Sequence, residues 1–225
     1  MTVAARYDPH ADWYEHYLAQ PGVVAFTDRV WRLLRELLGP GAGRCLEVGC
    51  GTGWHAGTLR DLGWTPVGID LSREQLRYAR TRLPVANGDA ARLPIGDGSV
   101  PAVACLLVHT DLPDYRAALT EIARVLRPGG RFVHIGVHPC FIGVFADWRD
   151  RPRVVIDERY ADRSHSYDAW CPAGVRAQVG AWHVPLADLL NGVIEAGLSI
   201  VRTAEAGAGG VPDLFGLLAH KPGRS

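Results

Sequence analysis

The sequence has no net charge and almost no lysine. Its 225 residues include 24 basic and 24 acidic side chains, and Lys221 is the only lysine among the basic ones. Proteins that bind nucleic acids normally carry an excess of basic residues, because they must neutralise phosphates. The balanced charge therefore argues against a nucleic-acid partner. A hydrophobic content of 48% and a charged content of 21% are typical of a globular domain, and the length suits one domain.

The chain also lacks the patterns of disulfide-bonded, secreted and membrane-spanning proteins. Its five cysteines are odd in number and irregularly spaced, with no CxxC pair, so we expect reduced thiols. No apolar run approaches the roughly 20 residues that a membrane-crossing helix needs. Residues 1–17 are polar and aromatic, unlike the apolar core of a signal peptide. These absences predict a cytoplasmic protein that does not associate with membranes.

Short apolar runs alternate with helical patterns up to residue 137. We expect strands at 44–48, 65–70, 85–86, 101–108 and 131–137. Helices are expected before and between them, at 30–38, 54–62, after a cap at Ser72, and at 114–126. This alternation, with short connections, predicts a doubly wound α/β fold with a parallel sheet.

Residues 138–180 interrupt the alternation with a segment rich in proline, aspartate, arginine and aromatic residues. Within it we expect a strand at 175–179, and after it a helix at 186–197 and strands at 198–205 and 214–221. An irregular insert of about 40 residues in a compact domain is usually functional, although a plain surface excursion is the alternative. We therefore expect one domain over residues 1–225, with an N-terminal helical lid segment at 1–40 and a substrate-shaping insert at 138–180.

A glycine-rich turn separates the strand at 44–48 from the following helix. Gly49, Gly51 and Gly53 let the backbone turn tightly and let a ligand approach the main chain. A dinucleotide site with GxGxxG spacing would require a small residue at position 54, where this chain has Trp54. The pattern therefore disfavours a dinucleotide.

Acidic residues follow each of the next two strands. Asp70 ends the second strand, where it could accept hydrogen bonds from ribose hydroxyls, and Asp89 follows the third within GDA. This order, ExGxGxG followed by the two acids, resembles the class I S-adenosylmethionine-dependent methyltransferases. LPD (112–114) and RVLRPGGRFV (124–133) are similar to the small-molecule, methyltransferase type 11-like branch. The resemblance covers residues 44–137 closely.

The resemblance implies a mostly parallel seven-stranded sheet of the Rossmann-like methyltransferase fold, with the insert after strand 5. It implies S-adenosylmethionine as cofactor, which carries no phosphate and needs carboxylates for its hydroxyls and amine. The cofactor-binding residues that it assigns here are Glu47, Gly49, Gly51, Gly53, Asp70, Leu71, Asp89, Ala90 and Leu106.

The fourth strand leads to His109-Thr110-Asp111, where the resemblance places the transferable methyl group. We predict that His109 and Asp111 are catalytic: the histidine would accept a proton, and the aspartate would orient it or hold the substrate. The alternative is that His109 packs beneath the cofactor and Asp111 caps the next helix. The [DNS]PP[YFW] motif of DNA amino-methyltransferases is absent here. A proline-cysteine pair occurs at Pro139-Cys140, but it follows strand 5 instead of strand 4.

Aromatic residues are concentrated in the N-terminal segment and the insert, where they would line a pocket suited to planar or apolar molecules. The alternative is a satellite core beneath the insert. The predicted substrate-binding residues are Tyr14, Tyr17, His138, Phe141 and His183. The spacing of histidine and cysteine after strand 5 matches no closed zinc site, so we expect no metal.

These patterns predict methyl transfer from S-adenosylmethionine to an oxygen or nitrogen atom of a small molecule, or alternatively to a carbon atom. Two other functions fit the same cofactor motifs. One is a non-methyl reaction such as cyclisation, and the other is a non-catalytic subunit that binds the cofactor and activates a partner. We expect a monomer or homodimer.

Overall fold

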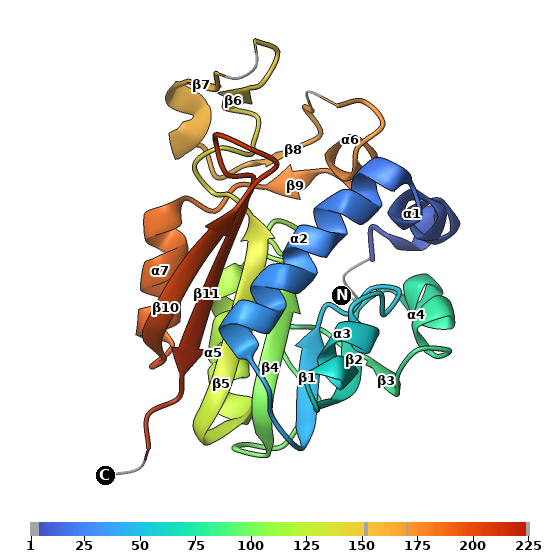
Figure 1. Ribbon diagram of the computed structural model, residues 1–225, viewed down its shortest axis with the longest axis vertical. Coiled ribbons are helices and arrows are strands. Elements are labelled where there is room, and N and C mark those ends of the chain that lie inside the picture. Colours follow the sequence, from blue (N-terminus) through green and yellow to red (C-terminus); the bar gives the residue numbers. More distant parts are fainter. Residues whose placement is uncertain (1–4, 151–152, 170, 224–225) are drawn as a thin grey trace.

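The computed structural model describes residues 5–150, 153–169 and 171–223. Its centre is a seven-stranded sheet (Figure 1) made of β1 (Arg44–Val48), β2 (Thr65–Asp70), β3 (Val85–Asn87), β4 (Val100–Leu106), β5 (Leu126–Val137), β10 (Ser199–Ala206) and β11 (Leu214–His220). The strand order is β10-β11-β5-β4-β1-β2-β3. Strands β1 to β5 are parallel, and β11 pairs antiparallel with both β5 and β10. The predicted mostly parallel sheet is therefore confirmed.

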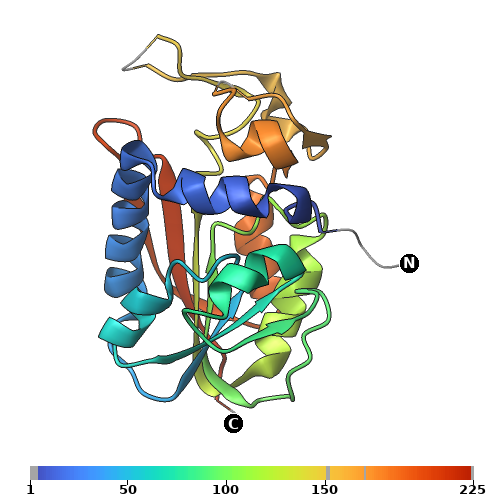
Figure 2. The same ribbon diagram turned by 90° about the vertical axis from the view of Figure 1, so that its right-hand side faces the viewer.

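Helices cover both faces of the sheet, as the continuous apolar runs of its central strands require. Figure 2 shows α2 (Pro21–Leu38) and α3 (Ala56–Asp61) on one side and α5 (Tyr115–Val125) and α7 (Leu186–Glu195) on the other. Along β4, Ala102 and Ala104 join the apolar cluster under α2, whereas Val103 and Cys105 join the cluster under α5 and α7. This alternation fixes which side of each strand faces which helix layer.

Two helices have the end residues that the sequence predicts: a glycine after α2 and a serine cap before α4. The apolar stripe of α2, which contains Val30, Leu33, Leu34, Leu37 and Leu38, is buried, and the helix ends at Gly39 with a φ of 65°. The side chain of Ser72 accepts a hydrogen bond from the backbone N–H of Gln75 and so caps α4 (Arg73–Ala79).

The N-terminal segment crosses the carboxyl ends of the strands (Figure 2). It contains a short 3₁₀ helix, η1 (Asp8–His10), and α1 (Ala11–Leu18). Three acidic residues tie it to the α4 region. The carboxylate of Asp8 accepts hydrogen bonds from the Ser72 hydroxyl at 2.7 Å and the Glu74 N–H at 3.3 Å. Asp12 accepts from Arg77 and Tyr78, and Glu15 pairs with Arg82.

The segment between β5 and α7 forms a separate layer over the carboxyl ends of the strands (Figure 1). It contains β6 (Ala146–Asp147), β7 (Val155–Ile156), η2 (Glu158–Ala161), β8 (His165–Ser166), α6 (Val175–Val179) and β9 (Ala181–Trp182). The strand predicted at 175–179 was wrong, because this segment is a single helical turn. Gly174 and Gly180 bound it, and Val175 and Val179, four residues apart, lie on the same side of that turn. A short run with two valines does not distinguish a strand from one helical turn.

The single lysine holds the end of α5. The ammonium of Lys221, which follows β11, donates to the backbone carbonyls of Ala123 at 2.7 Å and Leu126 at 2.8 Å, with Arg124 at 3.4 Å. A compact ammonium with three donors suits three converging carbonyls at a helix C-terminus better than the planar fork of arginine does.

We expect Lys221→Met to lower the free energy of unfolding by about 1–3 kcal/mol, because it removes charge-assisted hydrogen bonds to the carbonyls at the end of α5. Urea unfolding measures the change. Arg116→Met is the matched control, because that arginine lies on α5 and pairs with Glu195, and both side chains are more than half exposed. Its effect should stay within about 0.5 kcal/mol. Equal losses for the two variants would contradict this role of Lys221.

Candidate active site

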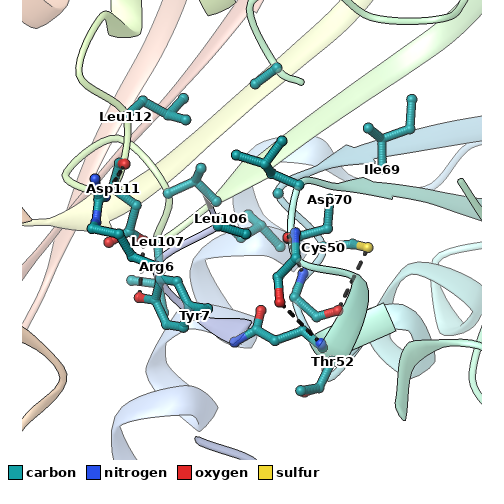
Figure 3. Close-up of a pocket in the computed structure, with 18 of the residues that line it drawn as sticks. Arg6, Tyr7, Cys50, Thr52, Ile69, Asp70, Leu106, Leu107, Asp111 and Leu112 are labelled. Carbon is teal, nitrogen blue, oxygen red and sulfur yellow. Dashed lines mark hydrogen bonds between the residues drawn. The ribbon is translucent and has the colours of Figure 1, made fainter. Parts of the chain in front are cut away.

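A first cavity, of about 200 Å³, lies at the carboxyl ends of β1, β2 and β4 (Figure 3). In open α/β sheets this is the edge at which ligands bind. Seven of the nine residues predicted to bind the cofactor line it: Gly49, Gly51, Asp70, Leu71, Asp89, Ala90 and Leu106. Glu47 and Gly53 do not line it.

The glycine turn has the backbone shape that the sequence predicts. Gly49, Gly51 and Gly53 have φ values of 69°, 53° and 77°, in the left-handed region. A Cβ atom on Gly49 would lie 2.5 Å from the Val108 side chain, and one on Gly53 would lie 2.5 Å from Leu83. Gly49 therefore lets the turn approach the exit of β4, and Gly53 lets it pack against the region after α4.

Four of the amides of this turn are already occupied by protein acceptors. The N–H groups of Gly49 and Cys50 donate to the Ile69 carbonyl, and that of Gly53 donates to the Cys50 carbonyl. The N–H of Gly51 donates to the Asp70 carboxylate. A pyrophosphate site presents free amides to its ligand, so the turn does not provide a phosphate nest of the kind a dinucleotide uses.

Asp70 joins the turns that follow β1 and β2. One carboxylate oxygen accepts the N–H of Gly51 at 2.7 Å, and the other accepts the N–H of Ser72 at 2.8 Å. Burial raises the pKa of Asp70, although both hydrogen bonds oppose that shift. Each carboxylate oxygen keeps a further lone pair, so Asp70 can still accept hydrogen bonds from ligand hydroxyls in the cavity.

Glu47 is a buried carboxyl group next to the glycine turn. It is 1% exposed, and neither of its oxygens has a hydrogen-bond partner among the residues that the structure describes. Burial, with the charge of Asp70 adding to it, raises the pKa of Glu47 to about 8. The carboxyl group is therefore mainly protonated at neutral pH, and a nearby ligand cation would favour its ionised form.

Acids outnumber bases around the first cavity. Its lining includes the four aspartates Asp70, Asp89, Asp111 and Asp114, against the single arginine Arg6. In Figure 3, Asp111 and Arg6 lie at one side of the cavity and Asp70 at the other. Such a lining favours a ligand with positive charge and hydroxyl groups over an anion.

A second cavity, of about 1030 Å³, adjoins the first. Its lining is largely apolar and comes from α1, α2, the exit of β4 and the segment between β5 and α7. The two cavities share the residues Tyr7, Tyr14, Leu18, Thr27, Leu107 and Asp111. Leu107 has a φ of 61°, a conformation that is rare for a leucine and more frequent at functional sites. Two ligands, one in each cavity, would therefore contact each other at the exit of β4.

Three segments that are distant in sequence meet at this exit. The guanidinium of Arg6 donates to the Asp111 carbonyl at 2.5 Å and lies 4.2 Å from the Trp182 ring centre. The backbone N–H of Trp182 donates to the Thr110 carbonyl at 2.8 Å. The N-terminal segment and the layer after β5 are thus joined directly to the loop after β4.

Asp111 is the titratable group at the boundary between the cavities. The hydroxyl of Tyr7 donates to its carboxylate at 3.2 Å. Removal from water raises the pKa of Asp111 to about 7, although the positive charge of Arg6 and the Tyr7 hydrogen bond oppose this. A carboxyl group with such a pKa can exchange a proton near neutral pH.

His109 was predicted as a general base, and its geometry does not support that role. Its ring is 1% exposed and lines neither cavity. It packs against His134 with ring centres 5.0 Å apart, and a Cβ on Gly136 would lie 2.3 Å from it. Burial, with His134 adding to it, lowers the pKa of His109 well below its ordinary value. The structure thus places His109 in the interior, outside both cavities.

The residues predicted to bind substrate are divided between the cavity and the interior. Tyr14 and Tyr17 line the second cavity. His138 and Phe141 lie elsewhere, where His138 contacts Glu205 through Nε2 at 2.7 Å. His183 packs against Phe145 and Tyr160 and lines neither cavity. The aromatic residues after β5 therefore include the satellite core that was the alternative interpretation.

Several lining residues have no motif that would reveal them in the sequence. Arg6, Tyr7 and Arg176 reach the cavities through tertiary packing alone. The three acids that anchor the N-terminal segment, Asp8, Asp12 and Glu15, can be recognised in the sequence, because their spacing would place them on one helical face.

Over the residues that the structure describes, no group of three or more potential metal ligands is present. Nor is any described helix both long and apolar enough to span a membrane.

Known proteins with similar sequences are methyltransferases. A family model described as a methyltransferase domain matches residues 46–134. The O-methyltransferase cnsE of Penicillium expansum is 33% identical over 167 residues, which cover 66% of this chain and 60% of that protein. A demethylmenaquinone methyltransferase of Deinococcus radiodurans is 34% identical over 130 residues, which cover 53% of this chain and 54% of that one. The chain thus spans between half and two thirds of the length of these relatives.

Solved structures share the fold. A crystal structure of an S-adenosylmethionine-dependent methyltransferase from Mesorhizobium loti has a TM-score of 0.71 at 23% identity, over 84% of this chain and 96% of that one. The [4+2]-cyclase SpnF has a TM-score of 0.64 at 21% identity, over 88% of this chain and 82% of that one. Residues 46–134 thus match a methyltransferase domain, the sequence relatives are methyltransferases, and the solved structures show that the chain has the fold of S-adenosylmethionine-dependent methyltransferases.

Proposed function

We propose that this protein transfers the methyl group of S-adenosylmethionine to an oxygen, nitrogen or carbon atom of a small molecule bound in the second cavity. The observation that carries the proposal is the pair of adjoining cavities. The smaller one is rich in carboxylates, the larger one is mostly apolar, and Asp111 lies at their boundary. Two reactants placed on either side of Asp111 would be positioned for direct transfer.

The first cavity fits the cofactor of the family. Asp70 has lone pairs free for the ribose hydroxyls, and Leu71 and Ala90 offer apolar contact to the adenine. Glu47 does not line the cavity, but its carboxyl group lies next to the glycine turn without a partner among the described residues, and its negative charge would favour the ammonium of the methionine part at that end. The bound cofactor supplies a methyl group that the positive sulfur already activates for displacement. The protein's work is then to position the acceptor and exclude water.

Asp111 supplies the proton transfer that some acceptors need. A hydroxyl or ammonium acceptor must lose a proton, and Asp111, whose pKa is about 7, borders both cavities. Tyr7 orients its carboxylate through the hydrogen bond at 3.2 Å. We propose Asp111 as the catalytic base and assign no proton transfer to His109.

The proposal is tested first by binding of the cofactor product. We expect calorimetry to show that S-adenosylhomocysteine binds the wild-type chain and binds Asp70→Ala at least about tenfold more weakly, because the substitution removes charge-assisted hydrogen bonds to the ribose. Asp61→Ala is the control, because Asp61 lies on α3, is 70% exposed and forms only a 3.7 Å pair with Arg35. Unchanged affinity in Asp70→Ala would overturn the assigned cofactor site.

Release of S-adenosylhomocysteine separates transfer from the other two functions. A screen that supplies S-adenosylmethionine with small-molecule alcohols, phenols and amines should yield this product only if a methyl group leaves the cofactor. A reaction that proceeds while the cofactor stays intact would support cyclisation instead. Cofactor binding without product across the screen would support a non-catalytic subunit.

The raised pKa of Asp111 predicts a pH-dependent effect of Asp111→Asn on stability. Between its ordinary pKa of 3.8 and about 7, the folded chain holds a proton on Asp111 that the unfolded chain has lost. This group's contribution to stability is therefore full at low pH and is lost as pH rises through that window. Asparagine does not titrate, so the melting temperature of Asp111→Asn relative to wild type should rise between pH 4.5 and 8.

Thermal unfolding of both proteins at pH 4.5 and pH 8, without cofactor, measures this difference. Asp114→Asn is the control, because Asp114 also lines the first cavity but is an exposed cap of α5. A difference for Asp111→Asn that does not change with pH would show that its carboxyl group titrates normally.

A further inference from the structure

The second cavity contains an arginine whose charge is not neutralised by a contact. Arg176, on α6, lines this cavity, and its guanidinium has no hydrogen bond or ion pair to any residue that the structure describes. The other arginine of the lining, Arg29, differs in this respect. It pairs with the carboxylate of Asp213 at 2.5 Å, with both side chains largely buried.

The surroundings of Arg176 make an unpaired charge unfavourable. Burial lowers the pKa of Arg176, and the negative charge of Asp111 opposes this from a distance longer than an ion pair. Arg176 is half-buried, and its guanidinium has no acceptor among the described residues, so its donors face the cavity. An anionic group of a ligand would supply the missing acceptors.

The backbone of α6 holds Arg176 in a defined place. The N–H of Gly180 donates to the Arg176 carbonyl at 2.8 Å and closes the helical turn. Gly180 has a φ of 69°, and a Cβ there would lie 2.2 Å from the ring of His165. Only glycine fits that position without displacing the histidine, so the turn that carries Arg176 is fixed by packing.

Arg176 is the one cation of the described lining that has no acidic partner, so it can accept one negative charge from a ligand. Its charged lining residues are Arg29, Arg176, Asp111, Asp168 and Asp213. Since Arg29 and Asp213 neutralise each other, Arg176 alone faces two further carboxyl groups. A carboxylate matches one guanidinium in charge and in its planar, two-oxygen geometry, whereas a phosphate dianion would bring a second negative charge toward these carboxyl groups.

Much of the rest of the lining is apolar. Val23 and Phe26 of α2, and Ile142 and Trp148 of the segment after β5, contribute side chains to it.

We propose that Arg176 binds a carboxylate of the substrate. The methyl acceptor is then an apolar small molecule whose carboxylate is separate from the methylated atom. This rests on the proposed function. Arg176 lines only the second cavity, so the carboxylate anchor leaves the boundary at Asp111 to the accepting atom.

Titration with matched acids and neutral analogues tests this proposal. The probes are octanoate against 1-octanol and 2-naphthoate against 2-naphthamide, added to the full chain with and without saturating S-adenosylhomocysteine. Calorimetry should show at least one carboxylate binding about tenfold more tightly than its neutral analogue, as expected for one charge-assisted contact. Arg176→Gln should abolish that preference while leaving the affinity for the neutral analogue unchanged. Arg176→Lys should retain part of it.

Arg163→Gln is the matched control, because this arginine lies in the same segment but is 57% exposed and pairs with Asp188. It should bind all four probes like the wild type, and circular dichroism should show that both glutamine variants are folded. The proposal is overturned if no carboxylate binds more tightly than its neutral analogue, or if Arg176→Gln keeps the preference. Tighter binding of octyl phosphate than of octanoate would overturn the choice of carboxylate.

The cofactor arm of this experiment distinguishes the two proposals. Failure of S-adenosylhomocysteine to bind the wild type would overturn the proposed function. The titrations without it would still show whether Arg176 selects a carboxylate.

Discussion

The carboxylate of Asp70 is the contact on which the first cavity depends. Its two oxygens accept N–H groups from the turns after β1 and β2, and so hold these turns at a fixed separation. Because the amides of Gly49, Cys50 and Gly53 donate to backbone carbonyls, carboxylate oxygens make up much of what is left for a ligand here. A cavity at the same edge of a related sheet can bind pyrophosphate when its amides are free. The class of ligand that such a cavity suits thus depends on whether the amides of the turn are free or already hydrogen-bonded within the protein.

The sequence predicted the central sheet because local pattern and tertiary environment agree there. Residues 101–108 form an apolar run that is long enough for a strand, and residues 102–106 of it lie in β4 and are buried on both faces. Ser72 was predictable as a cap from residue type and position alone. The glycine turn and Asp70 were predictable for a related reason, since each lies at a fixed distance from a strand end. Most of the predicted cofactor residues consequently lie around one cavity.

The predictions failed where the environment depends on contacts between distant segments. His109 is close in sequence to the end of β4, but the chain turns at Leu107 and the ring packs into the interior against His134. The turn at 175–179 is helical because of its glycine boundaries and its packing, which a run of five residues does not encode. Arg176 becomes a residue of the larger cavity only through that packing. Residues of the larger cavity were therefore less predictable from the sequence than those of the first cavity.

The position of the N-terminal segment has a consequence for the order of events in a catalytic cycle. Tyr7 and Tyr14 form part of the wall of both cavities, and Asp8, Asp12 and Glu15 anchor their segment to the α4 region. Displacement of this one segment would open the two compartments together. Release of a methylated product and exchange of the spent cofactor would then share a single opening motion, whose rate depends on three carboxylates that touch neither reactant.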